Sequence, residues 1–175
     1  ALLARTGLGK LEEFARKFRI LPPGAGSAKR FAAKCTGCQL CTRNCPEKII
    51  VPAKGAAGPV SLDLSRGSCR FDCNKCSRVC PTGAIRPLTL AVKQKTKIAE
   101  AHFNPQNCIV FQDDEECGKC AAVCPTHAIT LRKNGTPRGV NLKLCIGCGA
   151  CQEICPAPEK AMTVHEIENQ ILLEN

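Results

Sequence analysis

The sequence has 175 residues, 16 of them cysteine, with no tryptophan, no tyrosine, six phenylalanines and a formal net charge of +10. The aliphatic and aromatic core must therefore be small, and a domain with little core usually needs covalent or metal cross-links. This composition excludes a fold held by hydrophobic burial alone and makes the cysteines the candidate cross-links.

Residues 1–30 are predicted to form a basic amphipathic N-terminal arm. Apolar residues recur there at helical steps of three or four: Leu8, Leu11, Phe14 and Phe18. The segment LPPGAG, residues 21–26, ends this helix. Two interpretations stay open, namely packing on the rest of the protein or a peripheral membrane contact through residues 1–20. No nucleic-acid partner is expected, because no stacking aromatics accompany the basic residues.

From residue 35 onward, the cysteines fall into four groups of four, each followed by a proline, and none is left over. The first and last groups have the spacing C-x2-C-x2-C-x3-C-P. The second group has three residues in its first gap, and the third has eight. The groups are Cys35, Cys38, Cys41 and Cys45; Cys69, Cys73, Cys76 and Cys80; Cys108, Cys117, Cys120 and Cys124; and Cys145, Cys148, Cys151 and Cys155.

This spacing is typical of [4Fe–4S] ligands. Three cysteines at C-x-x-C steps let a loop place three thiolates on one cluster, while the fourth binds the other cluster of a two-cluster ferredoxin. The following proline suits a sharp exit from the loop. Structural zinc needs only two C-x-x-C pairs and gives no reason for the third cysteine and the C-P. We therefore predict four [4Fe–4S] clusters bound by all sixteen cysteines, with zinc or disulfides as the alternatives.

Short alternating segments precede two of the groups, at residues 60–64 (VSLDL) and 140–144 (VNLKL), and are predicted to be strands. Each repeat is then a strand, a ligand loop, a short helix and a strand, which predicts an α+β fold. Apolar residues after the ligand prolines are expected in the core, where they also shield a cluster from water: Ile50, Ile85, Ile129 and Met162.

The charged and titratable residues indicate no active site. The run Lys93, Lys95 and Lys97 is predicted to be a solvated linker or edge strand. Asp113 to Glu116, in the long gap of the third group, is interpreted as a solvated loop over one cluster, with a docking patch for a basic partner as the alternative. A further hypothesis is that this run lowers the potential of that cluster. Surface positions are expected for the histidines, which are His102, His127 and His165.

The charge is distributed unevenly along the chain. Residues 1–34 contain eight basic and two acidic residues. Because thiolate-ligated clusters add negative charge to the rest of the chain, we expect an acidic redox body that carries a basic arm. Nothing in the sequence resembles a nucleotide-binding loop, and we predict no catalytic residue.

Residues 35 to about 165 resemble bacterial-type ferredoxins. PPGA at residues 22–25, QNCIVFQ at 106–112 and CIGCGACQEICPAPEKAM at 145–162 are together similar to the MauM/NapG family. That resemblance implies a four-cluster electron-transfer subunit of the kind found with periplasmic nitrate reductase and methylamine dehydrogenase. Its implied partners are a membrane quinol-oxidising subunit and a terminal oxidoreductase. It favours membrane association on the periplasmic side, with a cytoplasmic location as the alternative.

The four groups can pair in sequence or in a nested order. Related multi-cluster subunits and the regular spacing of the two outer groups favour nesting, in a duplicated bacterial 2[4Fe–4S] ferredoxin-like fold. The predicted domains are then an outer one, residues 31–59 plus 140–165, an inserted inner one, residues 60–139, and a C-terminal tail, residues 166–175. The predicted ligand sets are Cys35, Cys38, Cys41 with Cys155; Cys145, Cys148, Cys151 with Cys45; Cys69, Cys73, Cys76 with Cys124; and Cys108, Cys117, Cys120 with Cys80.

The expected function is electron relay through four [4Fe–4S] clusters between these redox partners. Two alternatives from other classes remain. In the first, the protein is an assembly or maturation factor that binds a redox enzyme only during assembly of that enzyme. In the second, the chain is a fragment of a larger catalytic oxidoreductase.

Overall fold

The structure is a computed structural model that describes residues 20–52, 59–112 and 116–174. The predicted helix of the N-terminal arm and most of the acidic run, Asp113–Glu115, lie outside the described residues. The described chain consists of short helices and short antiparallel strands, which confirms the α+β class.

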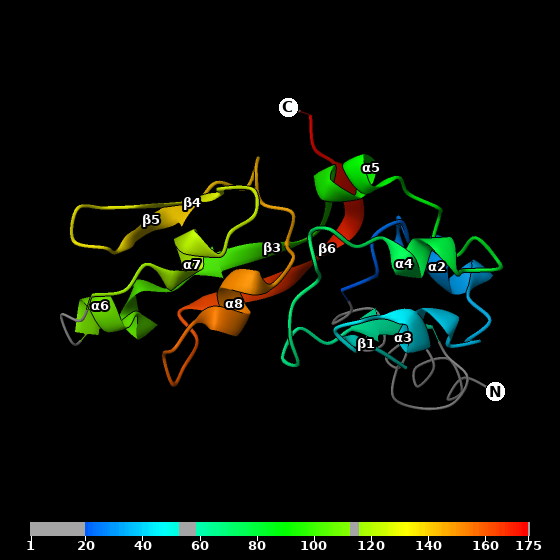
Figure 1. Cartoon of the computed structure of the whole chain (residues 1–175), viewed down its shortest axis with the longest axis horizontal. Coiled ribbons are helices and arrows are strands. Elements are labelled where there is room, and N and C mark those ends of the chain that lie inside the picture. Colours follow the sequence, from blue (N-terminus) through cyan, green and yellow to red (C-terminus); the bar gives the residue numbers. More distant parts are fainter. Residues whose placement is uncertain (1–19, 53–58, 113–115, 175) are drawn as a thin grey trace, which may run out of the picture.

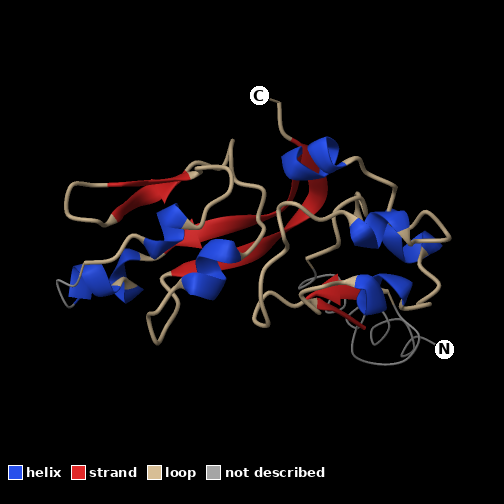
Figure 2. Ribbon diagram, viewed as in Figure 1, coloured by secondary structure: helices blue, strands red, loops and turns tan. Residues whose placement is uncertain are grey.

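Two lobes lie at opposite ends of the long axis, and a two-stranded ribbon crosses between them (Figure 1; Figure 2). The first lobe contains α2 (Ala28–Lys34), α3 (Leu40–Asn44), β1 (Ile50–Pro52), β2 (Val60–Leu62), α4 (Lys75–Arg78) and α5 (Leu90–Lys95). The second contains η1 (Pro105–Asn107), α6 (Ile109–Gln112), α7 (Lys119–Ala122), β4 (Ile129–Leu131), β5 (Pro137–Val140) and α8 (Ala150–Ile154). The ribbon is the antiparallel pair β3 (Thr96–Phe103) and β6 (Met162–Leu172).

The helices are short because the chain turns sharply at each cysteine loop. Three of them begin directly after a residue with positive φ, which reverses the chain before the helix starts: α3 after Gln39, α7 after Gly118 and α8 after Gly149. Helices α2 and α5 begin instead at polar N-caps. The Ser27 hydroxyl accepts the Arg30 N–H at 3.2 Å, and the Thr89 hydroxyl accepts the Val92 N–H at 3.3 Å.

The core is small and includes cysteines, as the composition requires. The apolar residues predicted to lie inside are all buried: Ile50, Ile85, Ile129 and Met162. They belong to clusters of buried residues in which cysteines are members or direct neighbours. The three histidines are exposed, as predicted.

The strand predicted at residues 60–64 is confirmed in part as β2, but the strand predicted at 140–144 is wrong beyond Val140. Residues after Val140 form a turn that Asn141 organises. Its carbonyl accepts the N–H groups of Leu144 and Cys145, both at 3.0 Å, and its side chain accepts the Lys143 N–H at 3.1 Å. Asparagine commonly stabilises turns through such local hydrogen bonds, and here they override the alternating pattern.

The prediction that residues 166–175 form a separate C-terminal tail is wrong, because β6 continues to Leu172. Its far end connects the ribbon to the first lobe. The Gln170 side chain accepts the N–H groups of Gly24 and Gly26 at 2.9 and 3.1 Å, and it donates to the carbonyls of Leu21 and Pro22 at 3.1 and 2.9 Å. The last strand therefore holds residues 21–26, which belong to the second half of the predicted arm.

The prediction that the lysine run is a solvated linker or edge strand is also wrong, because two of its three lysines are buried. Lys93 lies in α5 and is 2% exposed, and Lys97 lies in β3 and is 4% exposed, whereas Lys95 is exposed. The Lys93 ammonium donates a hydrogen bond to the Arg70 carbonyl in the second cysteine loop, and that of Lys97 donates to the Leu142 carbonyl in the turn before the fourth group. An alternating lysine pattern does not reveal such partners.

No helix among the described residues combines the length and the apolar character needed to cross a bilayer.

Replacing Gln170 by alanine is expected to lower the free energy of unfolding by about 2 kcal/mol, because backbone groups in a partly buried contact lose their partners. Denaturant unfolding of the loaded protein under anaerobic conditions measures this. The matched control is Gln106→Ala, since Gln106 is exposed. Equal stability of the two variants would contradict the assigned role of Gln170.

Candidate metal-cluster sites

Each of the sixteen cysteines lines one of four cavities, with four cysteines in each. The cavities are similar in size, each with about 20 to 30 Å³ of interior space. We number them by the cysteine group that supplies three of the four residues. Cavity 1 has Cys35, Cys38, Cys41 and Cys80; cavity 2 has Cys45, Cys69, Cys73 and Cys76; cavity 3 has Cys108, Cys117, Cys120 and Cys155; and cavity 4 has Cys124, Cys145, Cys148 and Cys151.

The nested pairing predicted from the sequence is wrong. In each cavity, the cysteine that precedes a proline comes from the neighbouring group along the chain, so the first group pairs with the second and the third with the fourth. Cys45 lies with Cys69, the arrangement that nesting forbids.

The reason for sequential pairing is local. A hairpin follows the first group and another follows the third, and each returns the chain to the loop that it left. In the first, Ile50 pairs with Leu62 and the Asp63 N–H donates to the Ile49 carbonyl at 2.7 Å. In the second, Ile129 pairs with Val140. Such short connections close at low entropic cost.

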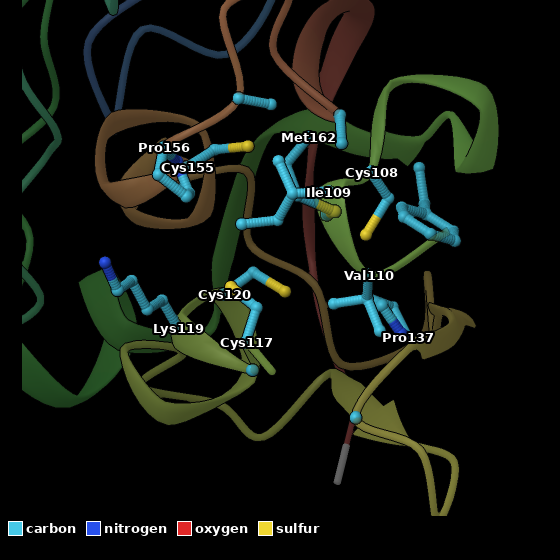
Figure 3. A pocket seen from close by; sticks show the side chains of 15 residues that line it. Cys108, Ile109, Val110, Cys117, Lys119, Cys120, Pro137, Cys155, Pro156 and Met162 are labelled. Carbon is cyan, nitrogen blue, oxygen red and sulfur yellow. The ribbon is translucent and has the colours of Figure 1, made fainter. Parts of the chain in front are cut away.

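Cavity 3 shows how the irregular third group is completed (Figure 3). Cys117 and Cys120 lie at the start of α7, while Cys108 reaches the same cavity from the other side of the eight-residue gap. Directly after Cys108, α6 occupies the start of that gap, and its Val110 is buried against the cavity. The prediction that the distant Cys108 belongs with Cys117 and Cys120 agrees with this placement.

The geometry fits a polynuclear cluster better than a single ion. Among the described residues, which include every cysteine, no three His, Cys, Asp or Glu side chains converge on one metal-ion position. A structural zinc ion requires such convergence. The sixteen cysteines form no disulfides with one another. What each cavity offers is four thiols around a space lined mainly by apolar side chains.

Burial disfavours ionisation of several of these thiols when no metal is bound. Burial, reinforced by neighbouring thiolates, raises the pKa of Cys76 and Cys151 to about 12. Burial likewise raises the pKa of Cys41, Cys120 and Cys148 to about 11. Metal ligation requires thiolates, so binding of a metal at these cysteines would release their protons.

Two of the cysteines that precede a proline receive hydrogen bonds at sulfur. Cys80 Sγ accepts the Ile85 N–H at 3.4 Å and lies 3.7 Å from the Thr82 hydroxyl. Although burial acts to raise it, the pKa of Cys80 falls below its ordinary value because of these hydrogen bonds. Cys124 repeats the pattern with Ala128 and Thr126, at 3.3 and 3.7 Å. These contacts come from the two C-P-T sequences of the chain.

The four cavities form a series. Helix α3 packs against α4 between cavities 1 and 2, and α7 packs against α8 between cavities 3 and 4. The lobes meet where the Cys69 N–H donates to the Cys148 carbonyl at 2.8 Å, which joins the backbone of cavity 2 to that of cavity 4. The order along the molecule is therefore cavity 1, 2, 4, 3.

The loop of cavity 4 also touches the ribbon. The Ile98 N–H donates to the Ile146 carbonyl at 3.0 Å, and Gly147, with a φ of +70°, lies so near Ala99 that a Cβ would collide with the Ala99 backbone. Sequence reasoning missed this contact and the Cys69–Cys148 contact. The glycine between two ligands was the available signal, because a close backbone approach commonly requires one.

The 4Fe-4S dicluster domain family matches three overlapping stretches of the chain, residues 34–84, 68–128 and 115–159. The first stretch spans the first two cysteine groups, the second spans the inner two, and the third contains the last group with most of the one before it. Because the matched stretches overlap, they do not determine the pairing.

Three similar proteins illustrate the range of relatives. Ferredoxin-type protein NapF of Escherichia coli (strain K12) is 30% identical over 142 residues, which are 78% of this chain and 80% of that protein. Methylamine utilization ferredoxin-type protein MauM of Methylobacillus flagellatus is 31% identical over 158 residues, 83% of this chain and 67% of that one. Ferredoxin-type protein NapG of Escherichia coli (strain K12) is 29% identical over 174 residues, 90% and 75% of the two chains.

Replacing Gly147 by alanine is expected to cost roughly 2–5 kcal/mol of stability, because left-handed strain adds to a backbone collision with Ala99. Gly83→Ala is the matched control. Gly83 has a φ of +64° and open space around its Cα, and its counterpart in the third group is His127, with a φ of +51°. We expect about 1 kcal/mol there. Anaerobic urea unfolding compares the two, and equal costs would exclude the close approach.

Proposed function

Because the chain belongs to the MauM/NapG family of ferredoxin-type proteins and carries [4Fe–4S] clusters, we propose that it relays electrons through four of them. Electron transfer is the activity common to ferredoxin-type iron-sulfur proteins. The count of four, the ligand sets and the partners are the proposal. The observation that carries it is the division of sixteen cysteines among four similar cavities, four in each.

Each cavity would hold one cluster through its four cysteines. A bound [4Fe–4S] cluster accepts and returns a single electron. The protein contributes the thiolates, the hydrogen bonds to Cys80 and Cys124, and the apolar side chains that keep water away. Hydrogen bonds to sulfur and exclusion of solvent are the means by which a protein tunes such a cluster.

A series of sites supports a relay rather than storage at separate sites. Cavities 1 and 3 lie at its two ends, one in each lobe, and cavities 2 and 4 meet at the lobe junction through Cys69 and Cys148. An electron entering at one end of such a series has a defined path to the other. We propose two successive ferredoxin-like units, residues 20–95 and 96–174, in place of an inserted inner domain.

For the partners, we propose a membrane quinol-oxidising subunit at one end and a terminal oxidoreductase at the other, on the periplasmic side of the membrane. The support is the family and the presence of two series ends on opposite lobes. The predicted membrane contact through residues 1–20 belongs to this proposal.

Paired cysteine substitutions test the ligand sets. Cys45→Ala and Cys69→Ala are each expected to remove one cluster, about four irons per chain. The double variant Cys45→Ala/Cys69→Ala should still lack only one, since both residues line cavity 2. The matched double variant Cys45→Ala/Cys145→Ala should lack two, because Cys145 lines cavity 4. Nested ligation would give the reverse pattern in anaerobic iron analysis.

The relay itself is tested on anaerobically purified protein. We expect about 16 irons per chain and a reductive EPR titration that accounts for about four electrons. Fewer than about 12 irons would contradict the proposal. Isolation of the tagged protein from its own cells should yield it with a mature redox enzyme. Recovery only with an immature, cofactor-free enzyme would favour the maturation factor instead.

A further inference from the structure

Lys93 places a buried ammonium beside cavity 2. The residue is 2% exposed, and its Nζ donates to the carbonyls of Arg70 and Phe71, the latter at 3.3 Å. Both carbonyls belong to the loop between the ligand candidates Cys69 and Cys73, and Arg70 itself lines the cavity. The Phe71 ring lies beneath the ammonium, with 6.0 Å between Nζ and the ring centroid.

The position of Lys93 coincides with the irregular spacing of the second group. Three residues separate Cys69 from Cys73, where the regular groups have two between their first cysteines. The longer loop presents two consecutive carbonyls on the side facing α5, and the Lys93 ammonium takes both. A lysine rather than a neutral donor at this place brings a full charge to the cavity wall.

Among the described residues, no carboxylate forms an ion pair with Lys93. Asp72 is the nearby candidate, but it is exposed and Arg70 binds both of its oxygens, at 3.1 and 3.0 Å. The buried Lys97 differs, because its Nζ lies 2.5 Å from a Glu100 oxygen. Of these two buried lysines, Lys97 is neutralised by a neighbour and Lys93 is not.

Besides Asp72, whose pKa Lys93 also acts to lower, the group that Lys93 influences is Cys69 of cavity 2. Burial raises the pKa of the Cys69 thiol, and the Lys93 ammonium is the strongest influence acting in the opposite direction. Charges interact more strongly in a buried site than at the surface, because water screens them less. A fixed cation at this wall favours whichever state of the cavity carries more negative charge.

We propose that Lys93 supplies the positive charge that raises the reduction potential of the cluster in cavity 2. This rests on the proposed function, since it requires a cluster held by Cys45, Cys69, Cys73 and Cys76. Reduction adds one electron and moves no proton, so the bound group becomes more negative by one unit and its attraction to the ammonium grows. Cavity 2 lies at the junction of the lobes, where a raised potential holds the electron midway along the series.

The test compares Lys93→Gln, which keeps a hydrogen-bond donor without the charge, with Lys93→Arg, which keeps the charge. Lys95→Gln is the matched control, because Lys95 is exposed in the same helix and the change in net charge is identical. Each protein is loaded with iron and sulfide anaerobically, analysed for iron, and titrated with dithionite while EPR follows each cluster.

In Lys93→Gln, we expect one cluster to bind its electron at least tenfold more weakly, a shift of 59 mV to lower potential for a one-electron couple. The other clusters should keep their potentials, and so should all clusters of Lys93→Arg and Lys95→Gln. Loss of one cluster from Lys93→Gln with full loading of Lys93→Arg would also support an interaction between the Lys93 charge and the cluster in cavity 2.

Unchanged potentials in fully loaded Lys93→Gln would overturn the inference. Loss of one cluster from both Lys93 variants would also overturn it, because the lysine side chain would then matter for its shape and not for its charge. These outcomes differ from failure of the proposed function. That failure would appear in the unsubstituted protein as too few irons, before any variant is compared.

Discussion

The structure depends on one geometric constraint, which is that the last cysteine of each group lines a different cavity from the other three. Every cavity therefore takes its cysteines from two segments of the chain. The hairpins after the first and third groups provide the second segment from nearby in the sequence. Left-handed residues at the helix starts and glycines at close approaches follow from the same need for sharp turns.

The cysteines also form much of the core, which explains how a chain so poor in large apolar residues can fold. Buried isoleucines, alanines and one methionine pack directly around the sulfur atoms. Folding and cluster binding are then coupled. Several thiols have raised pKa values, and a bound metal would favour their ionised form. The ribbon of β3 and β6 crosses between the two lobes, and the backbone contact between Cys69 and Cys148 brings cavities 2 and 4 together.

The longer gaps of the two inner groups contain structural features that the regular groups lack. The eight-residue gap of the third group begins with α6, which buries Val110 against cavity 3. The longer gap of the second group exposes two carbonyls to a lysine that brings an unneutralised charge. The regular outer groups carry no such additions, which fits a common ferredoxin unit modified at its inner sites.

The spacing of sixteen cysteines was sufficient to predict the clusters, the four groups and the membership of Cys108, because ligand spacing within a loop is a local property of the chain. The burial of Ile50, Ile85, Ile129 and Met162 followed from their places after the ligand prolines in the same way. The pairing of groups could not be predicted, because both orders satisfy the same spacing and the choice depends on where the hairpins return the chain. The burial of Lys93, the turn at Asn141 and the continuation of β6 to Leu172 could not be predicted either, since each is stabilised by partners distant in sequence or by competing local hydrogen bonds.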